Sequence, residues 1–218
     1  RAEEERAATA ALEAALGEDW PSGDAVTQSR LCRGWSITQL AGGYRYCADD
    51  VLCAQLALSA SPGAKRMLDL GSGVGTIGLI WLAQQPRPLR DGICTMLEAQ
   101  VVSVALCRET LRRHGLESAV DLNHGDLRNP EVLANVASSG GFDVITANPP
   151  YLTQTVGALP HHPQRAHCRH ELRGGVMEFV RAAAGLLAPA GRFCIIHAAP
   201  REAEVRSALA ACGFRALR

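Results

Sequence analysis

The stretch "RMLDLGSGVGTIGLIWLAQQ", residues 66–85, decides the fold. Its first five residues are mostly apolar and predict a short buried strand. The glycines of "GSGVG" end that strand, and the apolar run that follows predicts a helix. A strand, a glycine loop and a helix form the first unit of a parallel sheet with crossover helices.

The same alternation continues toward the C-terminus. Further strands are predicted over residues 92–98, 119–126, 142–147 and 192–198. Between and after them, helices are predicted over 99–115, within 174–191 and over 201–213, with a break in the chain at 189–191. We therefore predict an α/β, Rossmann-like fold, a mostly parallel sheet with helices on both faces.

The N-terminal part follows a different pattern. Residues 1–16 are rich in alanine and glutamate and predict a helix, which Gly17 closes. Residues 25–46 contain two short strand-like runs that suggest a hairpin, and residues 49–60 predict another helix. We divide the chain into an N-terminal extension, residues 1–42, and a main domain, residues 43–218.

Composition narrows the class of protein. The chain has 218 residues, 47% of them hydrophobic, and 22 basic against 22 acidic side chains, so any surface for nucleic acid must be local. Its eight cysteines form no C-x-x-C pair, which is typical of reduced thiols in an intracellular protein. No apolar run approaches the ~20 residues of a membrane span. We expect a cytoplasmic protein that does not enter membranes.

The first strand ends in a candidate ligand loop. In such sheets ligands bind beyond the carboxyl ends of the strands. Asp69 stands at the strand end, and Gly71, Gly73 and Gly75 let the backbone approach a ligand closely. The run from Gly73 also matches the dinucleotide pattern G-x-G-x-x-G, but an acid so near the first glycine favours a cationic α-amino group instead. A tight turn without a ligand is the structural alternative.

The next two strand ends also carry acids. Glu98 can accept hydrogen bonds from both hydroxyls of a ribose, or it is a solvated acid that begins a helix. Asp126, followed by Leu127, can accept from the amino group of adenine, or it forms an Asx turn before the next helix. An α-amino group, a ribose and an adenine together belong to S-adenosyl-L-methionine, which we predict as the cofactor.

The fourth strand runs into "NPPY", residues 148–151. The side-chain oxygen of Asn148 and the carbonyl of Pro149 can accept hydrogen bonds from a substrate amine, and the two prolines stiffen the loop. Tyr151 offers a flat face on which a planar group can stack. Such a site would methylate a planar amino group through positioning and hydrogen bonding, without a strong general base. A simple turn is the alternative.

These motifs occur together in one family of proteins. "DLGSGVG" with Glu98, Asp126 and "NPPY" resembles the class I S-adenosylmethionine-dependent methyltransferases that modify adenine N6, guanine N2 or protein glutamine. The resemblance covers roughly residues 43–191. It implies an enzyme with a Rossmann-like fold that uses S-adenosylmethionine.

The resemblance can be narrowed. "GGYRYCADDVLCAQLA", residues 42–57, is similar to a segment of the bacterial tRNA(Val) adenine-N6-methyltransferases that closes over the cofactor. Tyr44, Arg45 and Asp49 are the matching positions. "RAHCRHE", residues 165–171, is similar to a stretch that follows NPPY in that family. Release-factor glutamine methyltransferases share NPPY but carry a longer helical N-terminal domain.

The stretch "HHPQRAHCRHELR", residues 161–173, is locally basic and suits contacts with RNA phosphates. We predict Arg165, Arg169 and His170 as substrate-binding residues and tRNA as the partner, with a protein substrate as the alternative. The residues of this stretch match no standard spacing of metal ligands, so we predict no metal site. An ordinary surface loop is the alternative interpretation of the stretch. A non-catalytic subunit of the same fold is the remaining hypothesis.

The C-terminus departs from the family pattern. The fold of this family ends with two further strands in an antiparallel hairpin, and "FRALR", residues 214–218, could begin only the first of them. We therefore expect an incomplete hairpin at this edge of the sheet.

Overall fold

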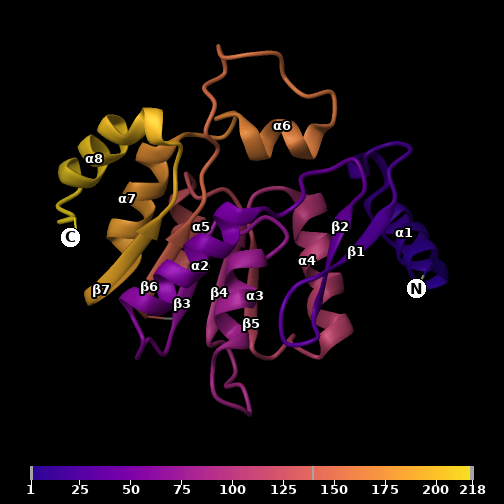
Figure 1. Ribbon diagram of the computed structural model, residues 1–218, viewed down its shortest axis with the longest axis horizontal. Helices are drawn as coiled ribbons and strands as arrows, with labels where there is room; N and C mark the ends of the chain where they lie inside the picture. Colours follow the sequence, from indigo (N-terminus) through magenta and orange to yellow (C-terminus); the bar gives the residue numbers. More distant parts are fainter. Residues whose placement is uncertain (1, 139, 217–218) are drawn as a thin grey trace.

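A five-stranded parallel sheet forms the centre of the molecule, in the order β5-β4-β3-β6-β7 (Figure 1). The computed structural model describes residues 2–138 and 140–216. All four pairings in this sheet are parallel. The strands are β3 (Met67–Leu70), β4 (Cys94–Glu98), β5 (Val120–His124), β6 (Phe142–Ala147) and β7 (Leu187–Ile195). This arrangement confirms the Rossmann-like α/β fold.

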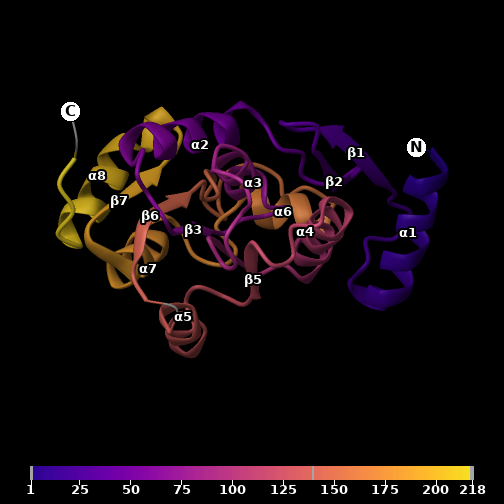
Figure 2. The same ribbon diagram turned by 90° about the horizontal axis from the view of Figure 1, so that it is seen from below.

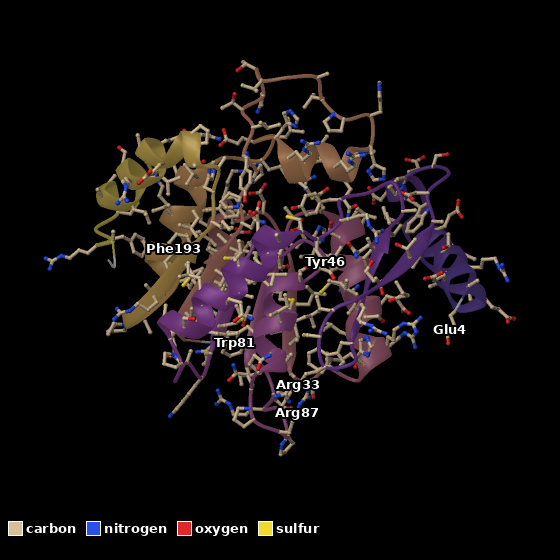
Figure 3. The ribbon with its side chains drawn as sticks, in the orientation of Figure 1. Glu4, Arg33, Tyr46, Trp81, Arg87 and Phe193 are labelled. Atoms are coloured by element: carbon tan, nitrogen blue, oxygen red, sulfur yellow. The ribbon has the colours of Figure 1, made fainter. Side chains whose placement is uncertain are left out.

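Helices cover both faces of the sheet (Figure 2). One apolar cluster joins the sheet to three helices and includes Trp81, a fully buried side chain that is labelled in Figure 3. These helices are α2 (Ala48–Ala60), α3 (Thr76–Ala83) and α4 (Val101–His114). A second cluster packs α5 (Pro130–Ala137) and α7 (Val176–Leu186) against the other face, and α8 (Glu202–Ala211) lies on α7.

The N-terminal extension packs against α4 (Figure 1). It consists of α1 (Ala2–Leu16), a 3₁₀ turn (Gly17–Asp19) and the antiparallel pair β1 (Val26–Arg30) and β2 (Ser36–Leu40). The predicted helix and hairpin are thus confirmed. The backbone N–H of Thr38 donates to the Thr110 hydroxyl of α4 at 2.9 Å, and Ile37 and Leu40 join the cluster under α2 and α3.

The predicted break at residues 189–191 is wrong, because these residues lie inside β7. The pairing register of β6 and β7 shifts between Phe142 and Val144, and Ala190 adopts a positive φ of 64°. A Cβ at Gly191 would lie 2.9 Å from the carbonyl oxygen of Phe142. Proline and glycine therefore mark a bulge in a strand here, not a loop.

The segment after NPPY contains a helix that the sequence did not predict, α6 (Pro163–Arg169), which stands over the end of the sheet (Figure 1). At the other end of the chain, residues 214–216 form no strand, and residues 217–218 lie outside the described residues. The Phe214 ring packs 5.5 Å from that of Phe193. In the described part of the chain, β7 is thus an edge strand, and the expected incomplete hairpin stays a prediction.

None of the helices in the described ranges is both long and apolar enough to cross a bilayer. All eight cysteines fall within those ranges, and each is a free thiol.

Candidate active site

A cavity of about 400 Å³ opens at the carboxyl ends of β3, β4, β5 and β6. Most of the predicted site residues line it: Tyr44, Asp49, Gly71, Gly73, Glu98, Asp126, Leu127, Asn148, Pro149, Tyr151 and Arg169. Four predicted residues are not part of this lining, namely Asp69, Gly75, Arg165 and His170. The strand ends therefore converge on one site, as the order of motifs along the chain predicted.

The glycine loop is shaped for close approach of a ligand. Gly71 and Gly73 have positive φ angles of 65° and 55°, which favour glycine. A Cβ at Gly71 would lie 2.9 Å from the Phe179 ring, whereas one at Gly73 would meet nothing within 4 Å. Gly75, with φ of 89°, begins α3, and a Cβ there would lie 2.7 Å from the Cys107 sulfur. Gly75 thus serves packing beneath the loop.

Asp69 lies beneath the cavity and is completely buried. One of its oxygens accepts from the Thr146 hydroxyl at 2.8 Å, and the other accepts from the N–H of Gly78 at 3.3 Å. Burial raises the pKa of Asp69 to about 7, although both hydrogen bonds lower it. Its contact with an α-amino group stays a prediction, since the carboxylate is engaged below the glycine loop.

Glu98 connects the second strand end to the glycine loop. Its two carboxylate oxygens accept from the N–H groups of Gly73 and Gln100, at 2.8 and 2.7 Å. Burial raises the pKa of Glu98, while these hydrogen bonds and the charge of Arg173 lower it. A carboxylate has about four lone-pair sites, so two remain for the hydroxyls of a ribose.

Asp126 at the third strand end is paired with Arg128. The guanidinium donates to both carboxylate oxygens, at 2.9 and 2.7 Å, and the backbone N–H of Arg128 donates to one of them at 2.9 Å. These hydrogen bonds hold the pKa of Asp126 below its usual range. The turn that was the alternative interpretation is therefore present, and Asp126 lines the cavity as well.

The substrate end of the cavity contains a network that fixes Asn148. Its amide nitrogen donates to Asp50 at 2.9 Å, which leaves the amide oxygen free to accept from other donors. The Tyr151 hydroxyl lies 2.7 Å from that amide oxygen and 2.9 Å from a carboxylate oxygen of Asp49. Burial and the hydrogen bond to Asp49 raise the pKa of Tyr151, which keeps the hydroxyl protonated as a donor.

Residues after β7 support the same loop from the other side. The His197 ring lies 4.9 Å from the Tyr151 ring, tilted by 44°, and burial lowers the pKa of His197. Arg201 donates to the carbonyl of Tyr151 at 3.0 Å and to Glu171 at 2.6 Å. These partners lie 46 and 50 residues beyond Tyr151, and no motif in the sequence pointed to them.

The helix α6 covers the cavity and is tied to the segment before α2. Gln164 accepts from the N–H of Tyr44 and donates to Ser103, both at 3.0 Å. Of the predicted substrate-binding residues, Arg169 lines the cavity and Arg165 is exposed on α6. The structure instead buries His170, whose ring lies 3.2 Å from the carbonyl of Val156, so this histidine shapes the loop from within.

The sequence missed further residues of the site. Asp50 falls in the helix predicted over residues 49–60 without a predicted role, yet its carboxylate accepts from Asn148 and orients it. Gln100, His167, Cys168, Arg173 and Phe179 also line the cavity. Three of these five lie in the basic stretch 161–173, and no role was predicted for any of them. Across the described residues, no cluster of three or more metal-ligating side chains occurs.

The cavity fits S-adenosylmethionine in chemistry and size. Ligand cavities commonly measure ~300–1,000 Å³, and this one falls in that range. Glycines leave space above the loop, Glu98 has free lone pairs, and the hydroxyl of Ser72 is buried in the lining with no partner among the described residues. Glu98 would hold the ribose, Asp126 and Leu127 the adenine, and the glycine loop the amino acid part.

A parallel sheet with a glycine loop at its first strand, an acid at its second and Asn-Pro-Pro-Tyr after its fourth defines a class I methyltransferase. The profile of the methyltransferase small domain family matches residues 47–212. The chain belongs to this family, whose cofactor is S-adenosylmethionine. The family and the cofactor predicted from the motifs are thereby confirmed.

Curated relatives of two kinds match the chain. A tRNA1(Val) (adenine(37)-N6)-methyltransferase of Bacteroides thetaiotaomicron is 29% identical over 64% of this chain and 54% of its own length. One from Escherichia coli is 27% identical over 75% of this chain and 64% of its own length. A release factor glutamine methyltransferase of Caulobacter vibrioides is 34% identical over 51% of this chain and 36% of its own length. The chain thus spans less than two thirds of each relative.

Solved structures share the fold. TrmN from Thermus thermophilus superposes with a TM-score of 0.50 at 24% identity, over 78% of this chain and 43% of that one. A SAM-dependent methyltransferase from Agrobacterium tumefaciens gives a TM-score of 0.55 at 14% identity, over 84% and 58% of the two chains. At these identities the likeness concerns the fold.

Proposed function

We propose that this chain is an N-methyltransferase that transfers a methyl group to the exocyclic N6 of an adenine in tRNA. The orientation of Asn148 carries the proposal. The amide nitrogen of Asn148 donates to the Asp50 carboxylate at 2.9 Å, so the amide oxygen of Asn148 remains as the acceptor for a ligand in the cavity. An acceptor fixed in this way suits a substrate that arrives with N–H groups, as an exocyclic amine does.

The residues of the chain would act by positioning. The lone pair of an exocyclic amine is delocalised into the ring, so two acceptors, Asn148 and the carbonyl of Pro149, would hold its hydrogens and aim the lone pair at the methyl group. S-adenosylmethionine, when bound, supplies that methyl group on a positively charged sulfur. The flat face of Tyr151 would stack on the base once it is unpaired.

Asp49 gives the network a second acceptor. The single proton of the Tyr151 hydroxyl can serve Asn148 or Asp49, which lie 2.7 and 2.9 Å away. When a substrate amine donates to Asn148, Tyr151 can donate to Asp49 instead, and no polar group is left without a partner. Tyr151 can therefore release Asn148 for the substrate without moving.

We choose tRNA adenine as the substrate because the relatives named for that activity align with a larger share of this chain. The aligned regions of the relatives named tRNA1(Val) (adenine(37)-N6)-methyltransferase cover 64% and 75% of this chain, against 51% for the Caulobacter release factor glutamine methyltransferase. A tRNA substrate also suits the exposed Arg165 of α6, beside the cavity. Methylation of a protein glutamine is the second candidate, since its planar amide would meet the same two acceptors.

A direct transfer experiment separates the two candidates. The protein is incubated with methyl-labelled S-adenosylmethionine and either unmodified tRNA or a release factor, and the modified unit is identified by mass spectrometry. We expect label on N6 of an adenine. Label on protein glutamine with none on RNA would refute the tRNA assignment and favour the second candidate.

A variant of Asn148 tests the role of the amide. Asn148→Ala is expected to abolish transfer while the Kd for S-adenosylhomocysteine changes less than about three-fold, because the amide serves the substrate amine. Asn135→Ala is the matched control, since Asn135 is exposed on α5, away from the cavity lining. Loss of cofactor binding in Asn148→Ala would place this residue in the cofactor site instead.

A further inference from the structure

Two residues of the cavity lining belong to the segment after NPPY, and each has one buried polar side-chain atom with no hydrogen-bond partner in the described part of the chain. These atoms are Nδ1 of His167 and one terminal guanidinium nitrogen of Arg173. A buried donor without a partner costs free energy, about 1–3 kcal/mol and more for a charged group. A guanidinium in this position points to a ligand acceptor that completes it.

The backbone holds Arg173 in a fixed place. A short bridge pairs Leu152 with His170, a second one pairs Leu172 with Gly174, and α7 begins soon afterwards. Gly174 has a φ of 92°, and a Cβ there would lie 3.0 Å from Glu178 and 3.3 Å from Arg128. This tight turn places Arg173 in the wall of the cavity, so its position does not depend on a flexible surface loop.

Arg173 shares the cavity lining with Glu98 and Asp126, the two acids predicted to bind the nucleoside. Its positive charge lowers the pKa of Glu98 and of Asp126, behind the larger effects of burial on the first and of Arg128 on the second. It also lowers the pKa of His167, adding to the effect of burial. Within the described residues no ion pair involves Arg173, whereas Asp126 is already paired with Arg128.

From this geometry we propose that Arg173 binds the adenosine half of the cofactor, donating to an acceptor atom of the ribose or of the adenine ring. Glu98 and Asp126 can only accept when ionised, so they recognise the hydroxyl and amino donors of adenosine. Arg173 can only donate, and it supplies the complementary recognition of acceptors in the same half. This inference rests on the use of S-adenosylmethionine that the proposed function includes.

Burial also distinguishes Arg173 from Arg165, the arginine that suits contact with RNA. The substrate end is formed by Asn148 and Tyr151, and the exposed Arg165 lies on the outer side of α6. A phosphate would meet Arg165 from solvent. Arg173 instead has a nitrogen that solvent does not reach, in a wall shared with Glu98 and Asp126.

Calorimetric binding of two ligands tests the proposal without any substrate. S-adenosylhomocysteine contains adenosine and the amino acid part, and 5′-methylthioadenosine contains adenosine alone. Arg173→Gln is expected to raise the Kd of both by the same factor, about ten-fold or more, because a hydrogen bond to a charged donor is lost from their common half. Arg173→Lys, which keeps a charge but not the planar fork, should give a smaller rise for both.

The matched control is Arg181→Gln, which removes the same charge from an exposed position on α7 and should leave both Kd values unchanged. A rise for S-adenosylhomocysteine alone would assign Arg173 to the carboxylate of the amino acid part and overturn the proposal. Unchanged Kd values for both ligands would also overturn it, and a raised KM for tRNA would then assign Arg173 to the substrate. If Arg173→Gln does not fold, Arg173→Lys carries the same comparison.

Whether tRNA or glutamine is the substrate does not affect this test, because it uses only cofactor analogues. Failure to methylate tRNA would overturn the proposed substrate and leave the assignment of Arg173 standing. Equal Kd values of the cofactor analogues for the wild type and Arg173→Gln would overturn the assignment of Arg173 and leave the proposed substrate standing.

Discussion

Replacing Asp50 by asparagine should disable the substrate site while leaving the cofactor site intact. The carboxylate accepts two hydrogen bonds on different oxygens, from the N–H of Cys47 and from the amide nitrogen of Asn148, both at 2.9 Å. The side chain is 7% exposed, so water cannot replace a lost partner. In Asp50→Asn one of these oxygens becomes an NH₂ group, and only one of the two donors can be satisfied.

Each outcome at this position has a cost. If the new amide keeps its oxygen toward Cys47, its nitrogen faces the nitrogen of Asn148, and the amide of Asn148 must turn over. Asn148 then presents a donor to the substrate amine. Losing a preorganised hydrogen bond of this kind lowers kcat by about 10²–10³-fold. If the new oxygen faces Asn148 instead, the N-terminus of α2 loses its cap, about 1 kcal/mol of unfolding free energy.

Single-turnover transfer to tRNA, calorimetric binding of S-adenosylhomocysteine and urea unfolding separate these outcomes. We expect the transfer rate of Asp50→Asn to fall by at least about 10²-fold while the Kd changes less than about three-fold. Asp49→Asn is the matched comparison, because Tyr151 needs only one acceptor there and an amide oxygen provides it. This variant should lose less than about ten-fold in rate. A normal rate in Asp50→Asn without a loss of unfolding free energy, or an equal loss of rate in both variants, would refute the orientation argument.

Three further changes test other parts of the site. Glu98→Gln leaves one side-chain oxygen to accept from the N–H groups of Gly73 and Gln100, which now donate to two oxygens. The change should raise the Kd of S-adenosylhomocysteine about 10–100-fold, and an unchanged Kd would contradict the ribose assignment. Gly75→Ala places a Cβ on a residue with φ of 89° and against the Cys107 sulfur. It should lower the unfolding free energy by about 1–3 kcal/mol or more in urea titrations, and an unaltered urea midpoint would contradict this packing role of Gly75. Because burial raises the pKa of Asp69 to about 7, the folded chain keeps a proton that the unfolded chain releases above about pH 4. Stability should therefore fall as pH rises from about 4 to 7, by at most about 1.4 kcal/mol per pH unit for this one group, and no further above that range. Asp69→Asn should flatten this part of the urea-unfolding profile, and the same slope in the variant would count against the reasoning.

The strands and the order of the site residues could be predicted because they depend on local sequence. Buried parallel strands are short apolar runs, and glycines or prolines end them. The strand over 142–147 has the predicted bounds. The same signals misled at 189–191, where proline and glycine stand in a bulge of β7 instead of a loop. A local breaker cannot say whether the chain leaves a strand or only bends within it.

The partners within the site could not be predicted, because they depend on contacts between distant parts of the chain. Asp50 lies 98 residues before Asn148, and Tyr44 lies 120 residues before Gln164. Neither Asp50 nor Gln164 belongs to a glycine loop or to NPPY. Their roles follow from the packing of α2 and α6 over the strand ends, which only the folded chain shows.

The first turn of α2 and the NPPY loop form one hydrogen-bonded unit, although the sequence presents them as separate motifs. Asp49 and Asp50 hold the two polar side chains of NPPY, and Gln164 ties Tyr44 to α6 above them. Residues of the segment whose resemblance favours tRNA adenine are therefore bonded to the residues that contact the substrate amine in our proposal. A change at Asp50, in the first turn of α2, can therefore alter the orientation of Asn148.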